Sequence, residues 1–299
     1  MEAARSTIRV TPETKLTRRN LLRGAALGAG ALALYSGEIE RHWIDHRKIS
    51  IPIAGMSEAM DGFRIVQVSD IHLEEFTEPS FLRDAVRRVN AMKPDAVVLT
   101  GDFITTSTRS TDFPEKAAQL CAEILNGLEC RSVHGILGNH DAQVNPAAVT
   151  TILEAHGIPI LRNQHVPLEH GGGRLWLAGI DDMLAGRPDL DKTIPPQIRN
   201  IPNEPVILLG HEPDPALKIL RQPAGASVRL MLSGHTHGGQ VRLPFVGALK
   251  LPPLGERFAE GLFSLGSMKL YVNRGLGTVG LPLRFDCPPE ITEITLRAV

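Results

Sequence analysis

The sequence is poor in cysteine and in aromatic residues. Its 299 residues include three cysteines, and aromatic residues make up 4% of the chain. Cys121, Cys130 and Cys287 are an odd set with no C-x-x-C spacing, so they cannot build a complete disulfide framework. We expect them to be small buried hydrophobic side chains. The net charge is only -1, and no basic stripe interleaves with aromatic residues. This composition argues against a nucleic-acid partner.

The sequence also lacks an apolar run of the roughly 20 residues that cross a bilayer comfortably as a helix. The run from Leu21 to Leu34 is shorter than this. It overlaps the sequence Thr17-Arg18-Arg19-Asn20-Leu21-Leu22-Arg23, so paired arginines stand ahead of a mild Gly/Ala/Leu segment. This order resembles a twin-arginine export signal.

That resemblance implies a signal or anchor segment over residues 1–37 and a partner in the twin-arginine export machinery. The chain would then act in the periplasm or at the outer face of the cytoplasmic membrane. Ala31-Leu32-Ala33 offers a small-residue cleavage site, although no clean break follows it. An uncut signal would leave the protein tethered to the membrane. The alternative is a short N-terminal helix with a basic start.

Residues 38–299 have the length of one large domain. In the first half, short apolar runs typical of buried strands alternate with helical periodicity, which predicts βαβ units with right-handed crossovers. The predicted helices span Pro79–Met92, Phe113–Leu125, Pro146–Ala155 and, in the second half, the neighbourhood of Pro215–Leu220. The predicted strands are Lys48–Ile53, Phe63–Ser69, Ala96–Thr100, Ser132–Leu137, Ile158–Leu161, Val166–Leu168, Arg174–Gly179, Pro205–Leu209, Val228–Ser233, Lys269–Asn273 and Glu290–Arg297.

Metal-type ligands follow directly after five of these strands. The motifs are Asp70-Ile71-His72, Gly101-Asp102, Gly138-Asn139-His140-Asp141, Gly210-His211 and Gly234-His235-Thr236-His237. Open α/β sheets place their chemistry in the loops at the carboxyl ends of strands. We therefore expect these side chains to meet at one edge of the fold.

The candidate ligands are oxygen and nitrogen donors without a thiolate: Asp70, His72, Asp102, Asn139, His211, His235 and His237. Such a set suits Mn²⁺, Fe or Zn²⁺. Seven ligands are too many for one ion, but two ions that share one carboxylate would use them all. In two-metal sites with ions about 3.5 to 4 Å apart, a bridging hydroxide can attack phosphorus in line.

The order D-x-H, G-D, G-N-H-D, G-H and G-H-T-H resembles the calcineurin-like metallophosphoesterases, and in particular a bacterial branch with twin-arginine signals. The resemblance implies an αββα sandwich of two mixed sheets flanked by helices. It also implies that Asp70, His72 and His237 hold one metal, that Asn139, His211 and His235 hold the second, and that Asp102 bridges them. His140 would be the catalytic acid that protonates the leaving oxygen or steadies the phosphoryl group.

The sequence departs from the phosphoprotein phosphatases of this family after the G-D motif. Those enzymes continue with a further acid and an arginine, whereas this chain reads Phe103-Ile104-Thr105-Thr106. The carboxylate that would orient His140 is therefore missing at Thr105, and Asp141 is a weak substitute. Protein phosphatase activity becomes less favoured.

We therefore expect an exported, dinuclear-metal phosphoesterase that cleaves a phosphate ester or phosphodiester. One alternative is a membrane-associated pyrophosphatase or phosphodiesterase whose substrate is lipid-linked, such as a UDP-sugar lipid or a phospholipid. A less favoured alternative is a non-catalytic metal-binding protein, since a purely structural site has no use for His140.

Three other stretches invite interpretation. Gly275-Leu276-Gly277-Thr278-Val279-Gly280 matches G-x-G-x-x-G, but Leu281-Pro282-Leu283 cannot open the helix that a dinucleotide site requires. Asp181-Asp182 reads as a strand-end loop rather than an extra metal site. The segment 241–265 follows the last ligand motif and is rich in apolar residues, prolines and glycines. It is either a loop packed on the sheet or a cap over the site.

Overall fold

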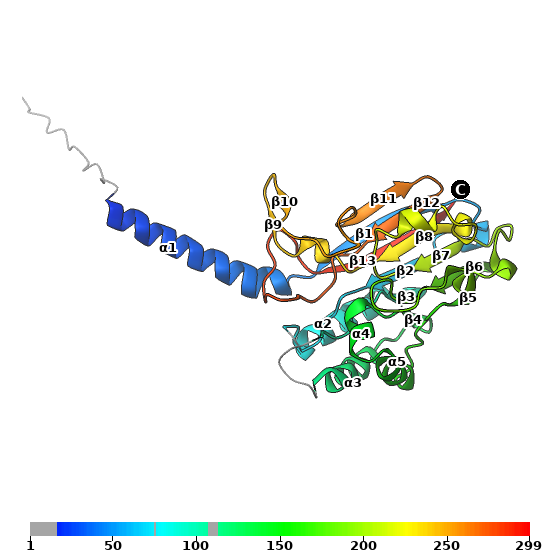
Figure 1. Cartoon of the computed structure of the whole chain (residues 1–299), viewed down its shortest axis with the longest axis horizontal. Coiled ribbons are helices and arrows are strands. Elements are labelled where there is room, and N and C mark those ends of the chain that lie inside the picture. The colour runs from blue at the N-terminus through cyan, green and yellow to red at the C-terminus, as the bar shows by residue number, and fades with distance from the viewer. Residues whose placement is uncertain (1–16, 75, 107–112) are drawn as a thin grey trace, which may run out of the picture.

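The computed structural model describes residues 17–74, 76–106 and 113–299 (Figure 1). Its α-helices are α1 (Arg18–Leu34), α2 (Pro79–Met92), α3 (Phe113–Leu125), α4 (Asn139–Val144), α5 (Pro146–Ala155), α6 (Leu190–Thr193) and α7 (Ala216–Ile219). Its strands are β1 (Asp45–Ile53), β2 (Arg64–Val68), β3 (Ala96–Leu99), β4 (Val133–Gly135), β5 (Gln164–His170), β6 (Gly173–Gly179), β7 (Val206–Leu209), β8 (Val228–Ser233), β9 (Arg242–Leu243), β10 (Gly247–Ala248), β11 (Gly261–Leu265), β12 (Met268–Val272) and β13 (Glu290–Ala298).

Two mixed sheets form the middle of the fold. The first has the strand order β1-β13-β2-β3-β4 and the second β11-β12-β8-β7-β6-β5. Strands β2, β3 and β4 run parallel to one another, as do β6, β7, β8 and β12. The antiparallel pairs are β13 with β2, β11 with β12, and β5 with β6. Parallel strands end at a common edge, so the loops after them are brought together.

Three apolar layers hold the sheets and helices together. The inner layer lies between the sheets and joins Ile65 and Val98 of the first sheet to Ile207 and Leu232 of the second. A second layer packs α2, α3 and α5 against the outer face of the first sheet, below the sheets in Figure 1. A third packs α6 and α7 on the outer face of the second sheet. The αββα sandwich expected from the sequence is confirmed.

Most predicted elements are present, and the exact bounds of α2, α3 and α5 match their predicted ranges. The predicted strand Ile158–Leu161 is wrong, because only Ile160 forms a bridge, to Gly135. Its partner β4 is only three residues long, so the hydrogen-bonded pairing stops after this one bridge. Asn139 and His140 were expected in a loop, but they open the short helix α4, whose cap is a backbone bond from Gly138 to the Asp141 carboxylate.

Helix α1 stands away from the sandwich and has no buried residue (Figure 1). Within the part of the chain that the structure describes, neither α1 nor any other helix combines the length and apolarity needed to span a membrane. Residues 1–16 of the predicted signal segment lie outside the described residues. Contacts with the domain begin just after α1, where Ser36 and Glu40 are buried.

Segment 241–265 consists of several parts. Strands β9 and β10 form a small antiparallel hairpin, which projects from the domain beside the inner end of α1 in Figure 1. The chain then returns past the ligand motif of β8, where the Thr236 hydroxyl donates to the Ala259 carbonyl, and ends in β11 at the edge of the second sheet.

Candidate metal centre

The five ligand motifs lie at the carboxyl ends of β2, β3, β4, β7 and β8, so both sheets contribute. A buried amide joins the sheets directly beneath them. Gln67 on β2 donates from Nε2 to the Thr100 hydroxyl, at 3.0 Å, and to the Ser233 carbonyl of the other sheet, at 2.9 Å. This bond fixes the spacing of the two sheet edges from which the ligand loops emerge.

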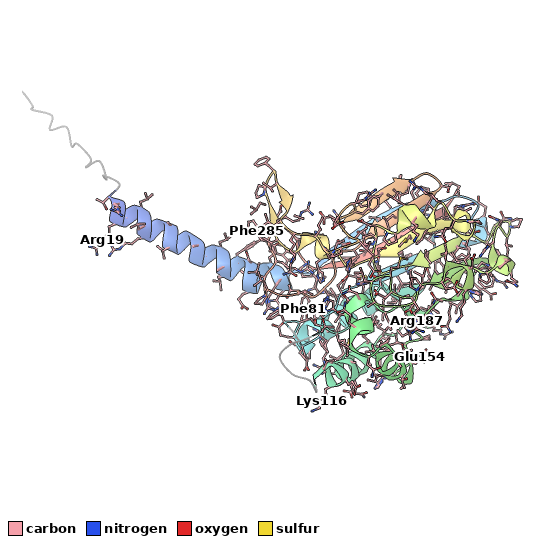
Figure 2. The ribbon with its side chains drawn as sticks, viewed as in Figure 1. Arg19, Phe81, Lys116, Glu154, Arg187 and Phe285 are labelled. Atoms are coloured by element: carbon pink, nitrogen blue, oxygen red, sulfur yellow. The ribbon has the colours of Figure 1, made fainter. Side chains whose placement is uncertain are left out.

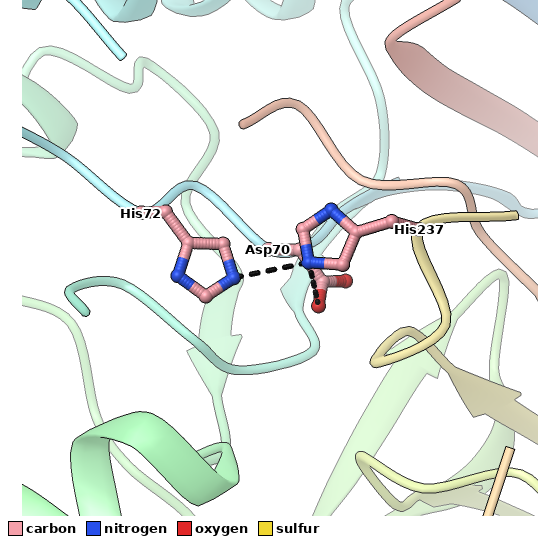
Figure 3. A group of neighbouring side chains, drawn as sticks. All are labelled: Asp70, His72 and His237. Atoms are coloured by element: carbon pink, nitrogen blue, oxygen red, sulfur yellow. Dashed lines mark hydrogen bonds and ion pairs between the residues drawn. The ribbon is translucent and has the colours of Figure 1, made fainter. Parts of the chain in front are cut away.

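Asp70, His72 and His237 form the first group of candidate ligands (Figure 3). The Nε2 atoms of the two histidines face each other at 3.1 Å, and Nε2 of His237 lies 3.5 Å from Oδ1 of Asp70. Nδ1 of His72 is engaged by the Thr105 hydroxyl at 2.8 Å, which leaves Nε2 for the centre. Two neutral imidazoles cannot both present lone pairs at this distance without repulsion unless a cation lies between them.

The second group contains Asp102, His211 and His235. Nδ1 of His211 bonds to the Thr100 carbonyl at 2.7 Å, and Nε2 of His235 bonds to the Pro253 carbonyl at 2.8 Å. A carbonyl only accepts, so these nitrogens carry the protons and the opposite ring nitrogens remain as ligand atoms. Within the described residues, the buried Oδ1 of Asn139 has no hydrogen-bond partner, so this amide oxygen remains available to a metal ion.

Asp102 lies between the two groups. Its Oδ2 is 3.5 Å from Nε2 of His72 in the first group and 3.1 Å from Nε2 of His211 in the second. Its Oδ1 accepts a bond from the backbone N–H of His140 at 2.9 Å. One oxygen is therefore fixed by the backbone while the other is shared by both groups, which is the position a bridging carboxylate requires.

The backbone is strained at the same residues. Five of the candidate ligands have left-handed backbone angles, with φ between 47° and 70°: Asp70, His72, Asp102, His235 and His237. A residue with a side chain in this region carries a conformational cost of order 1 kcal/mol or more. Such a concentration of strain at one point is typical of a functional site, where the side-chain directions matter more than local stability.

Burial sets the protonation states of these groups in the absence of a cation. Burial lowers the pKa of His72 to about 3 and that of His235 to about 4, and it raises the pKa of Asp70 to about 6. Burial also disfavours charge on His211, but the carboxylate of Asp102 outweighs this and holds the pKa of His211 well above its usual range.

His140 lies at the open side of the cluster, with its ring edge-on to His72 at a centroid distance of 5.0 Å. Its Nδ1 contacts both the backbone nitrogen of Thr106, at 3.1 Å, and the Thr106 hydroxyl, at 2.9 Å. Because the backbone N–H can only donate, Nδ1 must accept, and the neutral ring carries its proton on Nε2. Nε2–H is then the atom available to donate a proton.

The residue that orients His140 was not identified from the sequence. Thr106 fills this role, whereas the carboxylate of Asp141 accepts from the backbone N–H groups of Phe103, Ile104 and Gly138. Asp141 thus holds the two ligand loops together and does not orient His140. The missed signal was the pair Thr105-Thr106, which supplies one hydroxyl to His72 and another to His140.

The other stretches singled out in the sequence have structural roles. Leu276 and Gly277, within the G-x-G-x-x-G match, bond to the carbonyls of Ser69 and Asp70, so this loop backs a candidate ligand. Asp181 pairs with Arg162, and Asp182 accepts from the backbone of Ala185. Among the described residues, the groups able to hold a metal include neither aspartate.

Comparisons with known proteins identify the family of the chain. A family model described as calcineurin-like phosphoesterase matches residues 63–239. The uncharacterized metallophosphoesterase YkuE of Bacillus subtilis (strain 168) is 38% identical over 296 residues, covering 95% of this chain and 99% of that protein. Phosphodiesterase YaeI of Escherichia coli (strain K12) is 32% identical over 238 residues, covering 78% and 82%. The UDP-2,3-diacylglucosamine pyrophosphatase LpxG of Chlamydia trachomatis serovar D is 30% identical over 285 residues, covering 78% and 83%.

The packing around Gly138 yields a test of the cluster. A Cβ at this position would collide with the Asp102 carboxylate. We expect Gly138→Ala to displace Asp102, to lower the metal content of the purified protein and to reduce its phosphoesterase activity at least about 10-fold. Gly30→Ala is the control, because nothing lies within 4 Å of a Cβ there. Metal analysis that finds the same content in both variants would show that Asp102 does not need its present position.

Proposed function

Because the chain belongs to the calcineurin-like phosphoesterase family and is a phosphoester hydrolase, we propose that it works with two divalent metal ions. We assign Asp70, His72 and His237 to one ion, Asn139, His211 and His235 to the other, and Asp102 to both. Mn²⁺, Fe and Zn²⁺ all suit this mixed nitrogen and oxygen set. A non-catalytic metal-binding protein is the weaker reading, since His140 stands at the open side of the cluster as a proton donor.

The observation that carries this proposal is the convergence of buried lone pairs that lack a counter-charge. Among the described residues, Oδ1 of Asn139 and Nε2 of His211 are buried without a hydrogen-bond partner, and the Nε2 atoms of His72 and His237 face each other at 3.1 Å. An unpartnered buried polar atom costs about 1 to 3 kcal/mol. Divalent cations at the two groups would remove these penalties together.

The chain's own residues supply orientation and a proton. When bound, the two ions would activate water and offset the charge that develops on the phosphoryl oxygens. Thr105 and the carbonyls of Thr100 and Pro253 hold the imidazole rings with the ligand nitrogens inward. Thr106 holds His140 with Nε2–H available to protonate the leaving oxygen.

Among phosphoesters, we favour a phosphodiester. One relative is named a phosphodiesterase, and Thr105-Thr106 replaces the acid and arginine that follow the G-D motif in phosphoprotein phosphatases. A diester carries one negative charge fewer than a monoester, so it depends less on an additional arginine. Assays of the metal-loaded protein on matched monoester, diester and pyrophosphate substrates test this choice, which a clear preference for monoesters would overturn.

A lipid-linked substrate is the second candidate. A relative of 30% identity is named a UDP-2,3-diacylglucosamine pyrophosphatase. The chain also exposes many large hydrophobic side chains on α1 and on the β9–β10 hairpin. A UDP-sugar lipid or a phospholipid would combine a phosphoester bond with apolar chains that such a surface can contact.

We further propose that the chain is exported in folded form by the twin-arginine route and acts in the periplasm or at the outer face of the cytoplasmic membrane. Arg18 and Arg19 begin α1, and no charged residue occurs from Gly24 to Leu34. Export after folding suits a protein whose metal cluster is assembled from loops distant in sequence.

We expect Asp102→Asn to nearly abolish hydrolysis and to lower the metal content, because the amide cannot share a negative charge between two ions. Asp84→Asn is the matched control, since Asp84 pairs with the surface arginines Arg87 and Arg88 of α2, away from the metal centre. Elemental analysis that finds two metals per chain, with full activity, in Asp102→Asn would refute the bridging assignment.

His140→Ala should retain both metals and lose about 10² to 10⁴-fold in rate, with the smallest loss for good leaving groups such as nitrophenol. Thr106→Val removes one of the two contacts to Nδ1 and should cost about 5-fold, since a hydrogen bond contributes about 1 kcal/mol. Rates should be measured across a series of leaving groups. An equal loss on good and poor leaving groups would exclude proton donation by His140.

Replacing Arg18 and Arg19 together by lysine should retain the protein inside the cell, because the export receptor is expected to read the paired arginines. The charge of α1 is unchanged in this double variant, so its general basic character is preserved. Undiminished export on cell fractionation would show that the N-terminus is only a basic, apolar helix.

A further inference from the structure

Large hydrophobic side chains on the surface are concentrated in three segments. In the described part of the chain, all the large exposed hydrophobic residues except Leu184, Leu262 and Val299 belong to these segments. The first segment runs from α1 to Trp43, the second is the hairpin and the residue after it, and the third is the loop at Leu281. The side chains are Leu21, Leu22, Leu27, Leu32, Leu34, Tyr35, Ile39 and Trp43; Leu243, Phe245, Val246 and Leu249; and Leu281.

Hydrogen bonds join the three segments at their bases. The loop of Leu281 is bound to the base of the hairpin by Gln240, whose amide donates to the carbonyls of Val279 and Leu281. The backbone N–H of Arg242 donates to the Phe285 carbonyl, and that of Arg284 donates to Ser36 just after α1. Figure 2 shows Phe285 at this junction and Arg19 at the far end of α1. The bases of the three segments thus lie side by side.

The tip of the hairpin is built for outward exposure. Phe245 occupies the turn in a left-handed conformation, with φ of 67°, and its side chain is fully exposed, as Val246 next to it largely is. Pro244 precedes it and the Val246 N–H closes the turn onto the Leu243 carbonyl. Exposing two adjacent hydrophobic side chains to water is unfavourable, so such a turn indicates a surface that contacts a lipid or protein partner.

A lipid bilayer fits this surface. Helix α1 is apolar around its whole circumference from Gly24 to Leu34, whereas a helix that docks on a protein needs only one apolar face. Trp43 and Tyr35, at the domain end of that helix, are the residues enriched where hydrocarbon meets water. Three arginines lie at the opposite end.

We propose that the hairpin tip Leu243–Val246, together with Trp43 and Leu281, is a second membrane contact that inserts beside α1 into the lipid interface. It would fix the orientation of the domain, because one helix alone leaves the domain free to rotate. His237 lies only four residues before Val241, so this orientation brings the metal centre close to the lipid headgroups. The inference deepens the proposed function by naming the substrate class as phosphoesters of membrane lipids.

A single-tryptophan reporter tests the contact in the full-length chain. Phe245→Trp, made with Trp43→Phe and Trp176→Phe, places the only tryptophan at the hairpin tip. Vesicles of phosphatidylethanolamine and phosphatidylglycerol should shift its emission to the blue, and brominated acyl chains should quench it at least about 2-fold. The control is Leu262→Trp, made with Trp43→Phe and Trp176→Phe and with Phe245 retained. Leu262 is exposed on β11, outside the three segments.

Several results would overturn the proposal. The tip tryptophan could be quenched no more than the control, or the protein could fail to float with vesicles. An emission shift that depends on protein concentration without lipid would instead identify a second copy of the chain as the partner.

A kinetic comparison separates this inference from the proposed function. Phe245→Ser with Val246→Ser should leave hydrolysis of a soluble nitrophenyl phosphodiester unchanged, because neither residue belongs to the metal centre. It should lower kcat/KM for a vesicle-embedded phospholipid about 10-fold, since burial of one large apolar side chain changes partitioning by about this factor or more. Equal loss on both substrates would mean that the hairpin serves the fold. If the double variant kept full activity on both substrates, the hairpin would not be a lipid contact, but the phosphoesterase assignment would stand.

Discussion

The fold of this chain depends on one electrostatic constraint, the confinement of two carboxylates and four imidazoles in a small buried cluster. Asp70 and Asp102 are almost completely buried, and carboxylates in such surroundings are strongly destabilised unless they are paired with cations. The imidazole nitrogens add lone pairs where positive charge is needed, with Nε2 of His72 and Nε2 of His237 only 3.1 Å apart. Divalent cations would satisfy the carboxylates and the imidazoles with the same charge.

The architecture around the cluster can be understood as a means of holding it in place. Each sheet alone presents only part of the ligand set, so the two sheets must keep a fixed spacing, and the Gln67 amide provides it. Glycine precedes most of the ligands for a related reason. A Cβ at Gly234 would collide with the Asp70 carboxylate, and one at Gly138 with Asp102. The glycines in the motifs reflect close packing between loops as much as turn geometry.

The sequence predicted the parts of the structure that follow from local periodicity. Helices α2, α3 and α5 were recovered from the helical spacing of their apolar residues, and the strands that end in ligands from their short, continuous apolar runs. The strand expected at Ile158–Leu161 failed because pairing depends on the length of a partner strand, which periodicity does not encode. The role of Thr106 was missed for a similar reason. The local sequence does not show which backbone N–H reaches a ring nitrogen, and only the tertiary structure brings that of Thr106 to Nδ1 of His140.

The residues after α1 connect the N-terminal helix with the metal centre. The Glu40 carboxylate accepts from the backbone N–H of Cys287, and the Cys287 thiol contacts the carbonyl of His237 at 3.1 Å. A chain cut after Ala33 would keep Ser36 and Glu40 in place, whereas a cut beyond Glu40 would remove the support behind a candidate ligand. Glu40 is buried and follows α1 closely in the sequence, so these two bonds tie the chain just after the helix to the loop that carries His237. The residues that follow α1 are therefore part of the structural support of the site.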